Sequence, residues 1–314
     1  MYKDSRDLAL FLEQLRVSRG LSQEDFTEGI ISNRQYQRYI NGSSAMPFHL
    51  LDAFSERLNI KKEILLLEFD NYASKETQLI LDYFNAVSNK DLINASKIKE
   101  NINSKYIMDY TNLMLYNFSE LTETYILNKI DKIKYVSELS KLIDYPKILK
   151  KATVNTHEVV ILSTLLDNVS ETEKTQIVSK LSSFLSNPNL VWTGSEIITY
   201  NVVLFRLAKY SGIIKDFERV INFCNLGIKL NFKAKYFLNL EYYYYFLALS
   251  YFELNQKELF EENLYRCFTV LEVKDNHEKT MIMADIIKRD FNVDLIEFVN
   301  EYHRKKYKLN GLNT

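Results

Sequence analysis

The sequence contains very little glycine, proline or cysteine. Its 314 residues include 7 Gly, 3 Pro and 2 Cys, whereas average usage predicts roughly 22 Gly and 16 Pro. β-Sandwiches, β-propellers and collagen-like repeats consume glycine and proline at every turn, so their scarcity argues against those folds. It also argues against a glycine-rich phosphate-binding loop. Long, uninterrupted helices are the expected alternative.

Cysteine usage and hydropathy indicate a cytoplasmic protein. Cys224 and Cys267 have no partner at CxxC spacing, which is typical of small buried thiols in a reducing compartment. The N-terminus has no apolar signal region. The longest apolar run, residues 242–252, is too short to cross a bilayer. We therefore expect no membrane partner.

Catalytic and metal-binding motifs are missing from the sequence. The His-Glu pairs at 157–158 and 277–278 lack the second histidine of a zinc motif, because Ile161 and Met281 stand at those positions. No nucleophile elbow, Walker loop or kinase signature is present. We expect a protein that is not an enzyme and that needs neither a metal nor a cofactor.

Helical periodicity dominates the chain, and the predicted fold class is all-α. A block of five short helices is expected first, at 5–18, 22–29, 32–40, 47–58 and 61–69. The helices then lengthen, so we place a domain of residues 1–70 before a second domain of residues 71–314.

A weak internal repeat marks the C-terminal region. Helices are expected in pairs at 195–211 and 215–229, at 234–254 and 256–272, and at 277–290 and 293–308, with turns at Gly212 and Asn255. Leu207-Ala208 and Leu247-Ala248 lie 40 residues apart, and the two cysteines occupy similar places in the second helices. Helix pairs at constant spacing predict an α-solenoid similar to tetratricopeptide (TPR) repeats.

The most informative motif lies between residues 12 and 60. It combines Gly-Leu-Ser-Gln-Glu-Asp-Phe at 20–26, Ser-Asn-Arg-Gln-Tyr-Gln-Arg-Tyr-Ile-Asn-Gly at 32–42 and Ser-Glu-Arg-Leu-Asn-Ile at 55–60. This segment resembles the lambda-repressor-like (Xre) helix-turn-helix. More narrowly, it is similar to the Rgg/PrgX-type (RNPP-like) peptide-responsive regulators of Gram-positive bacteria. Ile40 departs from the Glu-Arg of many relatives, which puts the usual ion pair with the first helix in question.

The helix expected at 32–40 has the pattern of a DNA-reading helix. Tyr36 and Tyr39 are three residues apart and should both face the core, which turns four polar side chains outward: Asn33, Arg34, Gln37 and Arg38. Asn and Gln pair with adenine, and Arg pairs with guanine, in the major groove. The stretch Gly29–Leu51 contains no acidic residue, which favours binding to DNA.

The resemblance assigns roles to individual residues. Asn33 and Arg34 match the base-reading positions, and Gln23 matches a phosphate-contacting glutamine. Asn41 and the loop residues Ser43 and Ser44 are candidates for phosphate contacts, and Ser32, the expected N-cap, completes the predicted DNA-binding set. The expected partner is a double-stranded operator with two half-sites, bound by a homodimer.

The resemblance also implies that the C-terminal domain binds a short signalling (pheromone) peptide and contributes to dimerisation. Relatives clamp the peptide backbone with asparagines and basic residues on the inner helices. Asn201 and Asn239, each expected in the first helix of a pair, are the best candidates here, and Arg206, Lys235 and Tyr243 are expected on the same face. For each asparagine, a helix cap or an interhelix hydrogen bond is an equally good interpretation. For Tyr242–Tyr245, core packing is the better one.

The functional prediction is a dimeric transcriptional regulator of the quorum-sensing type, controlled by a peptide. Two alternatives remain open at this point: a phage lysis–lysogeny peptide receptor with the same layout, and a helical-repeat interaction scaffold with a vestigial DNA-binding domain. A vestigial domain has no need to keep the acid-free stretch Gly29–Leu51.

Overall fold

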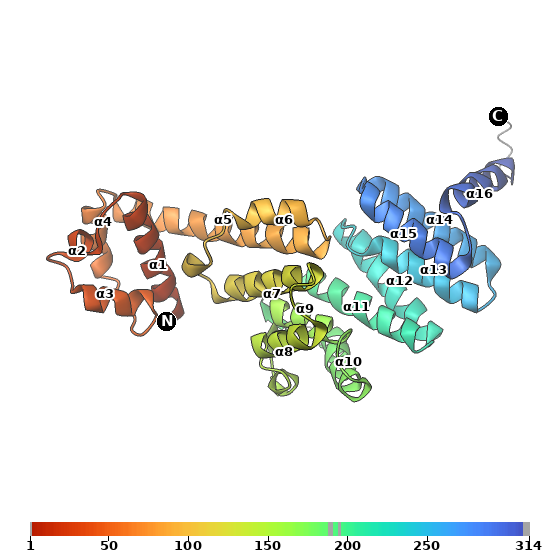
Figure 1. Cartoon of the computed structure of the whole chain (residues 1–314), viewed down its shortest axis with the longest axis horizontal. Coiled ribbons are helices and arrows are strands. Elements are labelled where there is room, and N and C mark those ends of the chain that lie inside the picture. Colours follow the sequence, from red (N-terminus) through yellow and green to blue (C-terminus); the bar gives the residue numbers. More distant parts are fainter. Residues whose placement is uncertain (1, 188–190, 194–195, 310–314) are drawn as a thin grey trace. The chain divides into compact units, whose positions relative to one another are not determined.

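The chain folds into two compact helical units. The structure, a computed structural model, describes residues 2–187, 191–193 and 196–309. Contacts between Cα atoms divide the chain into one unit of residues 1–142 and a second of residues 143–314 (Figure 1). The all-α fold class is confirmed.

The first unit consists of eight α-helices and one 3-10 helix within its described residues. Their bounds are α1 (Tyr2–Ser18), α2 (Gln23–Thr27), α3 (Asn33–Ile40), α4 (Leu50–Arg57), α5 (Lys62–Ser88), α6 (Leu92–Lys99), η1 (Ser104–Tyr106), α7 (Tyr110–Ile126) and α8 (Lys132–Leu142).

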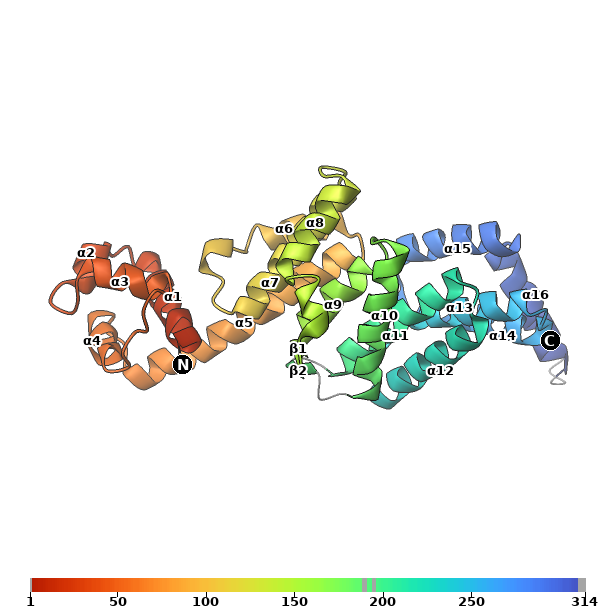
Figure 2. The same cartoon turned by 90° about the horizontal axis from the view of Figure 1, so that it is seen from below.

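The second unit adds helices and two very short strands. Their bounds are η2 (Lys147–Lys150), β1 (Val154–Asn155), α9 (Thr156–Leu165), α10 (Glu171–Ser186), β2 (Val191–Thr193), α11 (Glu196–Ile213), α12 (Phe217–Ala234), α13 (Leu240–Glu253), α14 (Lys257–Lys274), α15 (His277–Phe291) and α16 (Leu295–Leu309). Strands β1 and β2 pair in parallel and lie side by side (Figure 2). The sequence pattern does not indicate this pair, because two or three residues are too few to show alternation.

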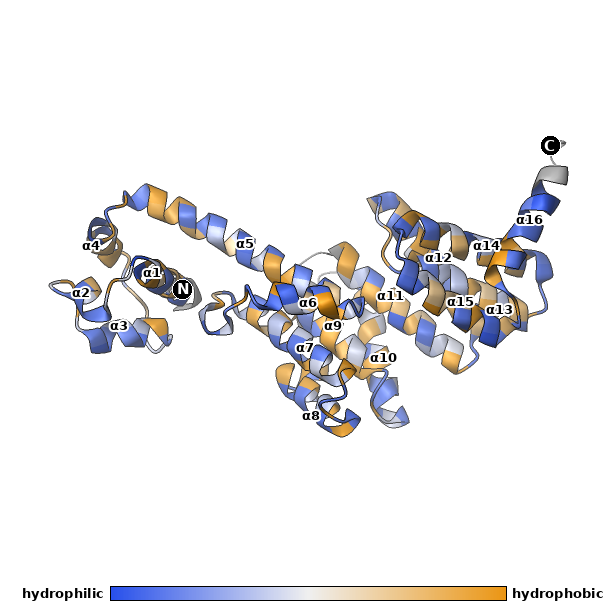
Figure 3. Ribbon diagram, turned by 45° about the horizontal axis from the view of Figure 1, so that its top comes forward, coloured by the Kyte–Doolittle hydropathy of each residue, from blue (hydrophilic) through white to orange (hydrophobic). Residues whose placement is uncertain are grey.

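The five expected N-terminal helices are all present, but the last one is much longer than predicted. Helix α5 has 27 residues and continues without a break to Ser88, through the position expected to separate two domains. Hydrophilic and hydrophobic turns alternate along it (Figure 3), so no change of composition marks its middle. The division at residue 70 therefore stays a prediction.

An aromatic core holds the first four helices together. Phe26 of α2, Tyr36 of α3 and Phe54 of α4 are each completely buried. The ring centroids of Phe26 and Phe54 lie 4.8 Å apart, and that of Tyr36 lies 5.6 Å from Phe26 and 5.8 Å from Phe54. Aromatic pairs at these separations add about 0.5–1.5 kcal/mol each beyond their buried area. This core fixes the orientation of α3.

The internal repeat of the second unit is visible in its backbone. Positive φ angles occur at Lys215 (58°) and, 40 residues later, at Asn255 (56°). They also occur at Lys235 (57°) and, again 40 residues later, at Asp275 (48°). These pairs end equivalent helices in successive repeats. Cys224 and Cys267 are both completely buried in the second helices, but they lie 43 residues apart, and the residue one period after Cys224 is the buried Leu264.

Several helix boundaries in the second unit differ from the prediction. The first turn lies at Lys215 instead of Gly212, because α11 continues to Ile213. The predicted helix 234–254 begins at residue 240, since Lys235 and Asn239 both adopt left-handed backbone conformations that interrupt it. The predicted start of the helix 195–211, at residue 195, lies outside the described residues. None of the described helices is long and apolar enough to span a membrane.

Candidate functional site

Helix α3 presents a polar, basic face on the surface of the first unit. Its N-cap is Ser32, whose Oγ accepts a hydrogen bond from the backbone N–H of Gln35 at 3.2 Å. As predicted, Tyr36 and Tyr39 face the core. Residues four and three apart share one face of a helix, so three exposed side chains form a continuous stripe: Arg34, Arg38 and Asn41.

The remaining predicted DNA-binding residues surround this stripe. Ser32 and Ser43 are exposed, whereas Asn33 and Ser44 are half-buried. Oδ1 of Asn33 accepts a hydrogen bond from the Thr27 hydroxyl at 2.5 Å, and the Ser44 hydroxyl accepts one from the Gln35 amide at 3.1 Å. Asn33 is thus tied to α2, and Ser44 fastens the loop after α3. Their DNA contacts stay predictions.

A chain of hydrogen bonds links α3 to α1 and α2. The Gln37 amide donates to Oε1 of Gln23 at 2.6 Å, and the Gln23 amide donates to Glu13 of α1 at 3.0 Å. Glu13 also accepts two hydrogen bonds from Arg16, at 2.7 and 2.8 Å. The burial of Glu13 opposes ionisation, but the hydrogen bonds from Arg16 and Gln23 outweigh it and lower the pKa of Glu13.

This network fixes α3 through amide side chains. It connects the carboxylate of Glu13 on α1 to α3 through the two glutamines. Gln23 and Gln37 therefore orient the exposed stripe from within the domain. Their direct contacts to DNA stay predictions.

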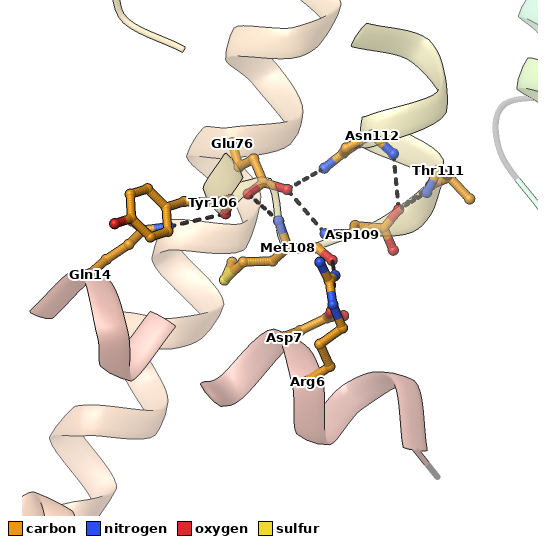
Figure 4. Close-up of polar contacts among 9 residues, drawn as sticks. All are labelled: Arg6, Asp7, Gln14, Glu76, Tyr106, Met108, Asp109, Thr111 and Asn112. Carbon is orange, nitrogen blue, oxygen red and sulfur yellow. Dashed lines mark hydrogen bonds and ion pairs between the residues drawn. The ribbon is translucent and has the colours of Figure 1, made fainter. Parts of the chain in front are cut away.

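A second polar cluster, for which the sequence carries no motif, fastens these helices to the helices that follow (Figure 4). We call it the clasp: Arg6 and Gln14 of α1, Glu76 of α5 and the segment 106–109. Arg6 donates to the carbonyl oxygen of Met108 at 3.3 Å, and Gln14 donates to that of Tyr106 at 3.1 Å. The segment is irregular, so these side chains satisfy backbone groups that no helix ladder satisfies.

Glu76 holds the same segment from the opposite side. Its Oε2 accepts from the N–H of Met108 at 2.9 Å, and its Oε1 accepts from the N–H of Asp109 at 3.3 Å and from the Asn112 amide at 3.0 Å. The Met108 side chain is 2% exposed and packs into the core of the first helices. Phe11 of that core contacts the ring of Tyr72 on α5 with centroids 5.6 Å apart. The first four helices are thus packed onto α5 and the start of α7.

In the second unit, Asn201 and Tyr243 come together but are directed into the core. Both are buried, with exposures of 1% and 0%. The Tyr243 hydroxyl donates to the carbonyl oxygen of Asn201 at 2.9 Å, and the Asn231 amide donates to Oδ1 of Asn201 at 3.0 Å. Asn231 also accepts from the N–H of Leu238 at 2.8 Å. The interhelix hydrogen bond, one of the two interpretations of Asn201, is present.

The other three predicted peptide contacts lie elsewhere. Arg206 on α11 forms an ion pair with Asp167. Lys235 and Asn239 were both expected within the first helix of a pair, at 234–254, but neither lies inside a helix. Lys235 is the left-handed C-cap of α12 and Asn239 is the N-cap of α13. Peptide contacts by these residues, and by Asn201 and Tyr243, stay predictions. Among the described residues, no group of three or more His, Cys, Asp and Glu is placed to hold a metal ion.

Comparison with known proteins agrees with this geometry. The HTH_3 helix-turn-helix family matches residues 12–65. No curated protein sequence matches the chain at a significant level. The fold is similar to that of the competence regulator ComR from Streptococcus vestibularis, solved with its signalling peptide XIP. That match has a TM-score of 0.50 at 17% identity and covers 90% of this chain and 98% of ComR.

Two further solved structures are similar over most of the chain. PlcR from Bacillus thuringiensis, in complex with the peptide PapR7 and DNA, has a TM-score of 0.49 at 15% identity and covers 88% of this chain and 98% of its own. The PrgX/cCF10 complex has a TM-score of 0.38 at 17% identity, with coverage of 95% and 93%. The helix-turn-helix match is thus confined to residues 12–65, and the fold over 90% of the chain is similar to that of ComR.

Proposed function

We propose that this protein is a DNA-binding transcriptional regulator whose helical-repeat unit binds a short signalling peptide. The observation that carries the proposal is the exposed stripe of Arg34, Arg38 and Asn41 on α3 of the helix-turn-helix domain. ComR, which shares the fold, is solved with a signalling peptide, and this supports the peptide part of the proposal.

The residues of the stripe and the loop after it make two kinds of DNA contact: contacts to base edges, which specify the sequence, and contacts to phosphates, which orient the domain. Arg34 is near the N-terminus of α3, the end that approaches base edges in a helix-turn-helix, and its guanidinium can donate two hydrogen bonds to guanine. Arg38 and Asn41 follow on the same face of α3, where they can reach the phosphate backbone of the DNA. Ser43, in the exposed loop after α3, contacts phosphate. Phosphate contacts orient the domain without specifying a sequence.

A single small domain of this kind seldom binds tightly enough alone. We therefore infer that a homodimer places two helix-turn-helix domains on two half-sites, with residues 1–70 as the DNA-binding domain and residues 71–314 as the peptide-binding and dimerisation domain. A regulator that acts on DNA and contains two buried, unpaired thiols suits the bacterial cytoplasm. A regulator of this kind requires no catalytic activity.

The clasp ties the DNA-binding domain to the helices that follow it within the first unit. Because α1 and Glu76 both hold the segment that leads into α7, a displacement of α7 moves the first four helices with it. A peptide alters DNA binding only if it has different affinities for the two arrangements. The acid-free stretch Gly29–Leu51 favours a DNA-binding regulator over the alternative of an interaction scaffold with a vestigial DNA-binding domain.

The test is a binding-site selection from a pool of randomised DNA duplexes with the full-length protein. We expect enrichment of a motif with two half-sites, and loss of that enrichment in Arg34→Ala. Lys75→Ala is the matched control, because Lys75 is an exposed basic residue of the same unit on α5, away from α3. Failure to enrich any motif, or equal enrichment by Arg34→Ala, would overturn the proposed DNA-reading role.

A further inference from the structure

Three aromatic side chains form a half-exposed cluster on the first helices of two neighbouring repeats. They are Phe205 on α11 and Tyr242 and Phe246 on α13, and we call them the aromatic cluster. The ring centroid of Phe205 lies 5.4 Å from that of Tyr242 and 5.9 Å from that of Phe246. All three side chains keep intermediate exposure, while their helix neighbours Leu204 and Tyr243 are buried.

Each end of the aromatic cluster carries a cation. The guanidinium carbon of Arg206 lies 5.4 Å from the centroid of the Phe205 ring. Nζ of Lys279, on α15, lies 4.9 Å from the centroid of the Tyr242 ring. A cation over an aromatic face is attracted to the ring quadrupole. The two cations therefore flank a half-exposed aromatic surface that an aliphatic or aromatic side chain of a ligand can contact.

The two cations belong to two groups of the same composition. Arg206 and Lys209 share the single carboxylate of Asp167, with Lys209 at 2.9 Å. Lys274 and Lys279 share the single carboxylate of Glu241, with Lys274 at 2.5 Å. Each group therefore has two positive charges and one negative charge. Within the described part of the chain, the four cations form no ion pair with any other carboxylate.

The surplus positive charge of each group is held close to the protein interior. Glu241 is 0% exposed, and the side chains of Lys274 and Lys279 are 23% and 21% exposed. Arg206 is 22% exposed. Charges removed from water this far interact strongly with a further ion, and burying them is costly unless they are paired. One carboxylate suffices to hold one cation, so each group can accept a second anion.

We propose that this face of α11, α13 and α15 binds a short peptide that carries an apolar or aromatic side chain flanked by a carboxylate. The inference rests on the proposed peptide-controlled function and specifies its ligand. The apolar side chain lies on the aromatic cluster, and the carboxylate pairs with the surplus cation at Lys279 or at Arg206. The carboxylate belongs either to the peptide C-terminus or to an Asp or Glu side chain.

Because each group has two cations for one carboxylate, one cation can be removed while the carboxylate keeps an ion-pair partner. Lys279→Gln removes the surplus charge and leaves Glu241 paired with Lys274, so the fold should be retained. Arg206→Gln likewise leaves Asp167 paired with Lys209. Lys288→Gln is the matched control, because nine residues along α15 place it on the opposite side of the same helix, where it is exposed.

The experiment is an affinity selection with the full-length protein and a pool of randomised heptapeptides, read by mass spectrometry. One pool has free C-terminal carboxylates and the other is C-terminally amidated. We expect the retained peptides to be enriched in apolar residues next to an acidic group. Retention only from the free-acid pool assigns the C-terminus as the anion, and enrichment of Asp or Glu in both pools assigns a side chain.

Individual peptides from the selection are then titrated against the variants. A charge-assisted hydrogen bond is worth about 1.5–3 kcal/mol, so Lys279→Gln or Arg206→Gln should raise Kd about ten- to hundredfold, whereas Lys288→Gln should not change it. Bound peptides that lack an acidic preference, or that bind both variants normally, would overturn this inference and leave the proposed function standing. Retention of no peptide would refute the peptide part of the proposed function itself. Displacement of the peptides by millimolar ATP would indicate a nucleotide site and would also overturn the inference.

Discussion

The substitution Gly227→Ala is expected to destabilise the second unit, although it replaces glycine with the best helix former. Gly227 lies inside α12, where the change alone should stabilise the helix by about 0.5–1 kcal/mol. The structure reverses this expectation. A Cβ at this position would lie 2.5 Å from Cε2 and 2.8 Å from Cε1 of Tyr243, well inside the separation of about 3.5 Å or more that carbon atoms prefer.

The ring of Tyr243 has little freedom to move away. It is completely buried, and its hydroxyl donates to the carbonyl oxygen of Asn201 at 2.9 Å. Overpacking of this kind costs about 1–3 kcal/mol, and loss of the hydrogen bond to Asn201 adds about 1 kcal/mol. After the gain in helix propensity is subtracted, the net loss in free energy of unfolding is about 1–3 kcal/mol.

Urea unfolding followed by circular dichroism measures the change, and a second helical glycine provides the control. At Gly212 an added Cβ would lie 3.8 Å from the nearest atom, on Val220, which is an ordinary contact. Gly212→Ala should therefore be neutral or slightly stabilising. In a Tyr243→Ala background the ring is gone, so Gly227→Ala should become stabilising. Equal or increased stability of Gly227→Ala in the wild-type background would refute the packing argument.

Three further outcomes follow from the helix-turn-helix domain, the clasp and the buried carboxylate. Arg34→Ala should lower specific DNA affinity by about 1–3 kcal/mol per half-site without altering the unfolding midpoint; a gel shift with unchanged specific affinity would contradict its role. Glu76→Ala removes the acceptor for two backbone N–H groups, so hydrogen exchange at Met108 and Asp109 should accelerate, whereas the exposed neighbour variant Lys75→Ala should leave it unchanged. Burial opposes ionisation of Glu241, but the charges of Lys274 and Lys279 outweigh it and hold its pKa below the ordinary 4.5. The contribution of ionised Glu241 to the free energy of unfolding is therefore complete above pH 4.5 and declines as the pH falls through the lowered pKa. Unfolding measured at a series of acid pH values should show this decline in the wild type and not in Glu241→Gln.

The sequence by itself determined the class of fold and the exposed face of α3. The scarcity of glycine and proline required long helices, and the spacing of Tyr36 and Tyr39 fixed which face of α3 is exposed. Both are local properties, because helix periodicity relates residues within a few positions of one another. The 40-residue repeat was readable for the same reason, since each repeat is one supersecondary unit.

Only the tertiary structure decided how polar residues are used. Asn201 and Tyr243 form hydrogen bonds within the core because α11, α12 and α13 bring residues about 40 positions apart into contact. The clasp joins Arg6 to Met108 over 102 positions, and many of its partners are backbone N–H and carbonyl groups, which leave no mark in a sequence. The excess of cations over carboxylates near the aromatic cluster also arises from distant residues. Charge pairing, burial and close approach at Gly227 are properties of packing, and one sequence contains no record of which helices will be neighbours.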